Sequence, residues 1–454
     1  MMRSMFSGVS GLKAHQAKMD VIGNNVANVN TLGFKAGRVT FQEIFNQTLR
    51  GAGAPDAATA RGGTNPMQIG LGIAVGSIDN QMTGGSPQRT DNPTDLSISG
   101  DGFFIVKGSI ADTFKFTRAG NFGLDKLGNL VSGDGMNVYG WTKYDTLGDG
   151  TVKFDTEAEI TPINLYSDVT NGNKKIIAAK ATSYAEFSGN LNSALPILAD
   201  PDDSDPQFTV PFTIYDSLGN AHELMVNFKK TDDLTDIPVK LPDGTDGTEP
   251  GTEWTYTISD KAGNSVLTDA GKVNFNSKGK LVLGDNDAPE QRIMEFDPGQ
   301  NSGTGKINIT LDFKKLTQYA GDNSVKPSNI DGYTTGNLVT FNIGSDGMLT
   351  GVYSNGQQQP LGLIALAGFD NPAGLQKVGG NLFIPTTNSG DFTKGVPAGS
   401  QGVGTLSPGT LEMSNVDLSR EFTDMIVTQR GFQANSRIIT TSDEMLQELV
   451  NLKR

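Results

Sequence analysis

The sequence predicts a multidomain protein with a long α-helix at each end and discontinuous, mainly antiparallel β domains between the helices. Three observations support this fold class. Apolar residues recur at alternating spacings of four and three near both ends, and they alternate with polar residues in the middle. Glycine-rich stretches without periodicity separate the middle from the ends. The 454 residues are enough for about three domains.

The C-terminal helix has the stronger pattern. Ser414 or Asn415 is expected to cap its start, and the stretch Leu418–Val450 contains no proline and one glycine, Gly431. Apolar side chains that recur every four and three residues are typical of a heptad stripe that packs against another helix. The predicted seam on this helix consists of Leu418, Phe422, Met425, Phe432, Ile439, Leu446 and Val450.

The N-terminal helix repeats the pattern more weakly. Gly8, Gly11 and Gly23 interrupt it, and each costs ~1 kcal/mol relative to alanine, so the helix needs a partner that buries its stripe. Packing of either helix on its own domain is the alternative. Residues 1–50 carry a net positive charge and residues 411–454 a net negative charge, which favours contact between the ends. The predicted seam here consists of Met5, Val9, Leu12, Met19 and Val26.

The middle of the chain has the period of β-strands. Phe208–Tyr215 and the residues after Asn220 alternate on either side of the turn Asp216–Asn220, which predicts a hairpin, and similar turns occur at Asp125–Asn129 and Asp260–Asn264. The expected layout is nearly symmetric. It has terminal helices at 1–30 and 411–454, connecting arms at 31–70 and 388–410, an inner β domain at 71–159 and 331–387, and an outer β domain at 160–330.

Composition argues against several classes of function. The net charge of −14 is unlike that of nucleic-acid-binding proteins, and no cysteine and only two histidines are available for metal or catalytic sites. A partial calcium-loop match at Asp145, Asp149 and Gly150 has Leu147 and Thr156 at two ligand positions. We therefore expect no enzyme and no catalytic, cofactor-binding or metal site.

No membrane insertion or cleaved signal peptide is expected. Apolar runs are far shorter than the ~20 residues of a transmembrane helix, and the N-terminus lacks the continuous apolar segment of a signal peptide. An acidic chain without cysteine suits an extracellular protein. Such a protein would need another route of export.

One ordered segment, NNVANVNTLGFK at Asn24–Lys35, follows the N-terminal helix. Gly33 is expected to adopt a positive φ where this helix ends. The segment resembles the N-terminal signature of the bacterial flagellar axial family, which contains rod, hook and hook-junction proteins. The motif residues carried over from the resemblance are Asn24, Asn25, Ala27, Asn28, Thr31, Gly33, Phe34 and Lys35.

Further segments are similar to the same family. Asp101–Val106 and Phe116–Trp141 resemble an inner β domain, and Gly409–Arg454 resembles the family's C-terminal helix. Ser188–Pro196 and Ser354–Phe383 are similar to hook proteins in particular. The resemblance is weakest at about 230–330. It covers both ends and most of the middle.

The resemblance implies a structural subunit that self-assembles into the flagellar hook, the flexible tubular joint transmitting torque from rod to filament. Its terminal helices would pair as a coiled coil lining the channel. The implied partners are further copies of the chain, the distal rod, the hook cap, the hook–filament junction proteins and the flagellar type III export apparatus, with an extracellular location after export. Hook proteins that crosslink through cysteine differ from this chain, which has none.

Two alternatives remain open at this stage. A distal-rod protein is similar at both ends, although rod proteins are expected to be shorter. A secreted β-rich adhesin with oligomerisation helices belongs to a different class.

Overall fold

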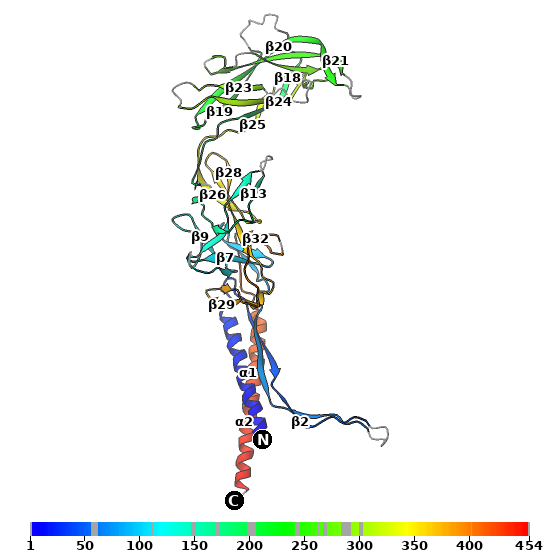
Figure 1. Cartoon of the computed structure of the whole chain (residues 1–454), viewed down its shortest axis with the longest axis vertical. Helices are drawn as coiled ribbons and strands as arrows, with labels where there is room; N and C mark the ends of the chain where they lie inside the picture. Colours follow the sequence, from blue (N-terminus) through cyan, green and yellow to red (C-terminus); the bar gives the residue numbers. More distant parts are fainter. Residues whose placement is uncertain are drawn as a thin grey trace. The chain divides into compact units, whose positions relative to one another are not determined.

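The computed structural model divides into two compact units (Figure 1). The first comprises Met1–Lys174, Phe341–Gly351 and Gln359–Arg454, and the second comprises Lys175–Thr340 and Val352–Gln358. The four-part layout with limits at 160 and 330 stays a prediction. The described residues are 2–55, 62–109, 112–146, 151–168, 172–197, 206–240, 246–261, 263–266, 270–282, 292–298, 303–400 and 402–452, so the calcium-like positions 147, 149 and 150 lie outside them.

Both terminal helices are present and pack together in the first unit. Helix α1 spans Met2–Ala27 and helix α2 spans Leu418–Asn451. Asp417 is the N-cap of α2, because its carboxylate accepts hydrogen bonds from two backbone N–H groups of the first turn. The expected caps, Ser414 and Asn415, are wrong. The Asn415 side chain is instead hydrogen-bonded to backbone atoms of the N-terminal part of the chain.

Two strand pairs follow α1. Strand β1 (Gly37–Glu43) pairs with β4 (Ile73–Asn80), and β2 (Asn46–Arg50) pairs with β3 (Met67–Gly70), both antiparallel. The β2–β3 pair extends away from the helices (Figure 1). The sequence interpretation places β1, β2 and β3 in the connecting arm 31–70, whose glycine- and alanine-rich part 51–70 shows no alternation.

The first unit also contains an antiparallel β sheet with an aromatic core. Its central strands, in spatial order, are β28 (Gln358–Ala367), β11 (Asn137–Trp141), β7 (Phe103–Lys107), β8 (Lys115–Thr117), β30 (Leu382–Ile384) and β29 (Gln376–Gly379). The core includes Phe103, Phe116, Trp141 and Phe383, each at most 2% exposed.

Shorter elements surround this sheet. Near the C-terminal helix, β32 (Thr405–Pro408) pairs with β6 (Leu96–Ser99), and β33 (Thr410–Glu412) pairs with β5 (Pro87–Arg89). Four short strands belong to the large sheet itself: β9 (Phe122–Leu124), β10 (Leu130–Ser132), β14 (Thr161–Pro162) and β31 (Val396–Pro397). The others are the pair β12 (Tyr144–Thr146) and β13 (Val152–Phe154), the pair β15 (Ser167–Asp168) and β16 (Gly172–Asn173), and the 3-10 helix η1 (Pro372–Gly374).

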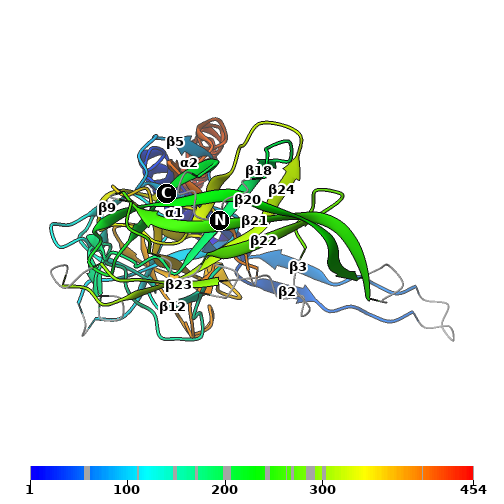
Figure 2. The same ribbon diagram turned by 90° about the horizontal axis from the view of Figure 1, so that it is seen from above.

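The second unit consists mainly of two four-stranded sheets around their own core. One has the order β23 (Arg292–Phe296), β24 (Ile307–Tyr319), β18 (Tyr184–Asn192) and β25 (Lys326–Ile330), with β18 and β24 parallel. The other has the order β19 (Phe208–Tyr215), β20 (Ala221–Lys240), β21 (Asp246–Asp260) and β22 (Gly271–Asn276). Figure 2 shows its strands β20, β21 and β22 from above. Strand β17 (Ile176–Ile177) also belongs to this unit, whereas β26 (Gly336–Ile343) and β27 (Met348–Tyr353) each contain residues of both units; in the large sheet the order is β17, β26, β27 and then β28.

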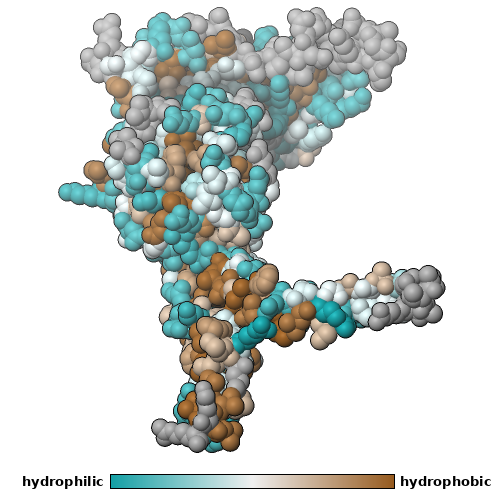
Figure 3. Space-filling model, turned by 60° about the horizontal axis from the view of Figure 1, so that its bottom comes forward, coloured by the Kyte–Doolittle hydropathy of each residue, from teal (hydrophilic) through white to brown (hydrophobic). Residues whose placement is uncertain are grey.

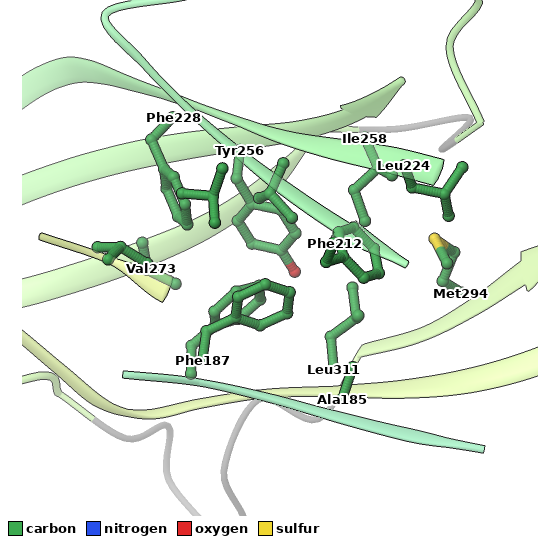
Figure 4. Close-up of a cluster of buried hydrophobic side chains, with 14 of the residues drawn as sticks. Ala185, Phe187, Phe212, Leu224, Phe228, Tyr256, Ile258, Val273, Met294 and Leu311 are labelled. Carbon is green, nitrogen blue, oxygen red and sulfur yellow. The ribbon is translucent and has the colours of Figure 1, made fainter. Parts of the chain in front are cut away.

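Side chains from both sheets of the second unit meet in one hydrophobic cluster (Figure 4). Phe187 of β18 packs against Phe212 of β19, with ring centroids 5.3 Å apart. The predicted hairpin is confirmed, because Tyr215 pairs with Ala221 across the turn Asp216–Asn220. This core lets the second unit be considered separately from the helices.

Candidate assembly surface on the terminal helices

Helices α1 and α2 contact each other through small and polar side chains. The contacts run antiparallel: Lys18 Nζ lies 3.1 Å from Asp424 Oδ1, and Asn25 Nδ2 donates to Glu421 Oε1 at 3.2 Å. We call this set of residues the contact stripe. It consists of Ser4, Gly8, Gly11, His15, Lys18 and Asn25 on α1, and Glu421, Asp424, Gly431, Asn435, Ile439 and Ser442 on α2.

Glycines bring the two helices close together. A Cβ at Gly8 would lie 3.3 Å from Ile439 Cγ1, and a Cβ at Gly11 would lie 2.6 Å from the Asn435 side chain. Gly23 differs, because a Cβ there would meet no atom within 4 Å. Two of the three glycines that weaken α1 are therefore explained by close packing, which a larger residue would prevent.

The predicted seam lies one residue beyond the contact stripe. On α1, each predicted seam residue directly follows a residue of the contact stripe, as Val9 follows Gly8. On α2, Phe422 follows Glu421 and Phe432 follows Gly431. One residue is a rotation of about 100° around an α-helix, so the two stripes face different directions.

No residue of the predicted seam is fully buried within one chain: five of the twelve are exposed and seven are half-buried. Phe422 is 50% exposed and Val450 is 68% exposed. Ile439 belongs to both stripes. Half-buried seam residues are Met5, Leu12, Met19, Val26, Met425, Ile439 and Leu446, and exposed ones are Val9, Leu418, Phe422, Phe432 and Val450.

Further apolar side chains widen this exposed surface, and Figure 3 displays hydrophobic residues around the helical end of the chain. An exposed apolar surface of this length on a protein indicates an interaction site. The exposed apolar surface consists of the exposed seam residues Val9, Leu418, Phe422, Phe432 and Val450 together with Met2, Phe6, Ile426, Val427, Ile438, Met445 and Leu449. The sequence did not predict Met2, Phe6 or Val427 as members.

Two titratable groups within the contact stripe are perturbed by burial. Burial, together with the nearby positive charge of Lys18, lowers the pKa of His15, whose ring lies edge-on to Phe41 with centroids 5.7 Å apart. Burial raises the pKa of Glu421, opposed by its hydrogen bond from Asn25. The protonation states of the two groups are thus coupled to the pairing of the helices.

The motif Asn24–Lys35 joins the helix pair to the rest of the first unit. Ala27 ends α1, and Asn25 exchanges hydrogen bonds with the backbone of Gly37 at 2.8 and 2.9 Å. Asn28 donates to the carbonyl of Asn24 at 2.9 Å. These contacts fix the direction in which the chain leaves the helix.

The second half of the motif packs into the β part of the unit. Thr31 Oγ1 donates to Asn28 Oδ1 at 3.1 Å. Gly33 has the expected positive φ, at 64°, and a Cβ there would lie 2.8 Å from the backbone nitrogen of Ala119. Phe34 is buried, with the Lys377 ammonium 4.7 Å from its ring centroid. Only glycine fits the close approach at position 33.

The motif ends in a buried cluster of charges. Lys35 Nζ lies 2.6 Å from Glu412 Oε1, and Arg118 Nη1 lies 3.4 Å from Glu412 Oε2. Each of the three side chains is at most 3% exposed. Burial lowers the pKa of Lys35, and the charge of Glu412 opposes this effect. The sequence marks Lys35 as a motif residue, but nothing in it signals Arg118 and Glu412 as its partners.

The described residues contain no cluster of three or more histidine and carboxylate side chains that could hold a metal ion. Neither α1 nor α2 is long and apolar enough to cross a membrane. His222 lies 3.3 Å from Asp216 at the predicted hairpin, as a hydrogen-bonded side chain of the fold.

Comparison with known proteins gives matches along the whole chain. Four family profiles match, described as flagella basal body rod protein, flagellar hook protein FlgE/F/G D1 domain, flagellar basal body protein FlaE D2 domain, and flagellar basal body rod FlgEFG protein C-terminal. They cover, in that order, residues 5–35, 97–172, 190–333 and 407–452.

Relatives match over their full length. The flagellar hook protein FlgE of Treponema pallidum is 40% identical, with all of both chains covered. A flagellar basal-body rod protein FlgG of Bacillus subtilis is 31% identical, also with all of both chains covered. Among solved structures, the Helicobacter pylori flagellar hook protein FlgE2 matches 72% of this chain and all of its own, with a TM-score of 0.49 and 15% identity.

These matches define a structural protein of the flagellar rod and hook class, consistent with the mostly antiparallel β fold and the packed terminal helices. Relatives and profiles are structural proteins and not enzymes. The chain belongs to the family of the flagellar hook protein FlgE and is a hook subunit.

Proposed function

We propose that copies of this chain assemble into the hook tube through the exposed apolar surface of α1 and α2. The single observation that carries this proposal is the separation of the two stripes. The contact stripe pairs the helices within one chain, so the exposed apolar surface remains for other chains. Burying a fully exposed Leu, Phe or Val contributes ~1.5–3 kcal/mol, and a surface with many such residues supports stable association.

The finer geometry of the tube is part of the same proposal. Contact positions spaced by four and three residues support a coiled coil of the two helices. The resemblance to the family supports helices lining a central channel and β domains at larger radius. The tube is the flexible joint that transmits torque from rod to filament.

The proposed partners follow from the family. Besides further copies of the chain, they are the distal rod, the hook cap, the hook–filament junction proteins and the flagellar type III export apparatus. The proposed location is the extracellular hook, reached by that export route without a cleaved signal peptide.

Chain length does not distinguish a hook protein from a distal-rod protein here. The relative from Bacillus subtilis that is named a rod protein matches all of this chain, although rod proteins were expected to be shorter. The name and higher identity of the hook relative favour the hook. The adhesin alternative has no support among the matches.

Sedimentation of the purified chain over a range of salt and protein concentrations, followed by electron microscopy of the pellet, tests the proposal. We expect a cooperative increase in sedimentation and tubes in the pellet. A discrete oligomer that does not grow with concentration would contradict self-assembly and support the adhesin alternative.

A further inference from the structure

The C-terminal segment before α2 completes the interior of the first unit. Strands β32 and β33 of this segment pair with β6 and β5, which come more than 300 residues earlier. Leu406 of β32 is 2% exposed. The backbone carbonyl of Glu412 also accepts from the N–H of Gly33 at 2.8 Å. One short segment thus contacts the N-terminal motif and completes two strand pairs.

Glu412 is the carboxylate at the centre of this closure. Its Oε1 accepts from Lys35 Nζ and, at 2.9 Å, from the backbone N–H of Gly85. Both cations beside it belong to earlier parts of the chain and have further partners there. Lys35 donates to the carbonyl of Thr83 at 2.8 Å, and Arg118 donates to the carbonyl of Gly100 at 2.9 Å.

Those carbonyls satisfy hydrogen bonds but supply no full negative charge. Without Glu412, Lys35 and Arg118 would be two like charges in the interior, and a buried charge without a counter-charge is strongly destabilising. Arg118 Nε makes no hydrogen bond to any described residue, and Asp101, the other carboxylate that favours the charged form of Lys35, has a smaller effect on the Lys35 pKa than Glu412. The chain up to residue 404 therefore lacks both the counter-charge and two of the strands.

We propose that Glu412 acts as a folding switch: the β part of the first unit closes only when the segment carrying Glu412 docks onto Lys35 and Arg118. Because Gly33 and Lys35 bind this segment, the same event joins the N-terminal motif to the start of α2. The second unit has its own core and folds without waiting for it. A chain whose C-terminal segment is not engaged keeps its first unit open.

The test is hydrogen exchange measured by mass spectrometry on the full chain and its Glu412→Gln variant. We expect the amides of β5, β6 and β8 to exchange at least about 100-fold faster in the variant, as for the loss of one partner of a buried ion pair. Amides of β18 and β24 should be unchanged. Glu157→Gln is the matched control, because Glu157 forms an exposed ion pair with Lys394 at 3.2 Å in the same unit.

The Glu412→Gln substitution could also unfold the first unit completely while the second unit stays folded. That outcome would support the proposal as the strongest case of the expected loss of protection. Exchange equal to that of Glu157→Gln, or equal acceleration in both units, would overturn the proposal. The triple variant Lys35→Met, Arg118→Met, Glu412→Gln separates charge from packing. Recovery of protection in β5 and β6 supports the switch, whereas protection as low as in Glu412→Gln overturns the role of the counter-charge.

Discussion

Gly431 of α2 lies directly against the imidazole ring of His15 of α1. A Cβ at position 431 would lie 2.8 Å from both Cε1 and Nε2 of His15. This contact sits in the middle of the contact stripe and sets how closely the helices approach. It also explains why a glycine persists inside a helix of 34 residues, where it lowers helix propensity.

Gly431→Ala should weaken the helix pair although alanine is the better helix former. Alanine gains ~1 kcal/mol of helix propensity over glycine. The new methyl group would clash with the rigid imidazole ring of His15, and such overpacking typically costs ~1–3 kcal/mol, which outweighs the gain. Thermal unfolding followed by circular dichroism of the helices measures the change. Gly23→Ala is the control, because its Cβ meets no atom, and it should stabilise α1. Equal stabilisation by both variants would contradict close packing at Gly431.

Acidification should loosen the helix pair through His15. Its pKa is lowered from 6.5 in the folded state, so stability present above pH 6.5 is lost as pH falls toward the lower folded value. Glu421 has the opposite effect on the pH dependence of stability. Its pKa is raised above 4.5 in the folded state, so the folded state gains stability as pH falls through that raised pKa toward 4.5. The measurement is therefore made in a Glu421→Gln background, where helix unfolding between pH 7 and 5.5 should be easier at the lower pH.

Adding His15→Gln to that background should remove the pH dependence. Protection of the α1 amides against exchange, corrected for intrinsic rates, provides the readout. A pH dependence that persists without His15 would assign the effect to another group.

Phe432→Asp should block assembly without unfolding the β units. Phe432 is 38% exposed in one chain, and a carboxylate buried there between chains costs several kcal/mol. Thr441→Asp is the matched control, because it adds the same charge to an exposed residue of α2 about 180° around the helix from Phe432, outside both stripes. Sedimentation gives the amount of polymer, and the near-ultraviolet spectrum monitors the β cores. Wild-type assembly by Phe432→Asp would count against the assembly surface.

Removal of most of the second unit should leave assembly possible. The backbone oxygen of Lys175 and the nitrogen of Leu338 lie 2.8 Å apart, so a two-glycine turn can replace residues 176–337. We expect a polymer with altered curvature or stiffness, because the proposed assembly surface lies on the helices. Loss of all polymer from a variant with a folded first unit would show that the second unit is required for assembly.

Sequence periodicity predicts the parts of this fold that repeat along one element. The heptad pattern predicts both helices, and alternation around Asp216–Asn220 predicts a hairpin that the structure confirms. The contact stripe was not predicted, because glycine, serine and charged residues carry no hydrophobic signal. Its repeat of small residues at Ser4, Gly8 and Gly11 is the signal that could have revealed it.

Contacts between distant segments are a different case. Lys35 and Glu412 are 377 residues apart, and neither periodicity nor composition connects them. The strand pairs of residues 37–80 escape prediction for a related reason, since their pairing depends on the fold and not on a local pattern.

The accessibility of single introduced cysteines tests the central claim most directly, because the natural chain contains no cysteine. Val9→Cys and Val450→Cys place small thiols on the exposed apolar surface, and Glu157→Cys serves as an exposed control on a β unit. Maleimide labelling is compared between unassembled and assembled protein. The account predicts that positions 9 and 450 react before assembly and become protected in the polymer, while position 157 reacts in both. Equal labelling of positions 9 and 450 in the polymer would contradict it.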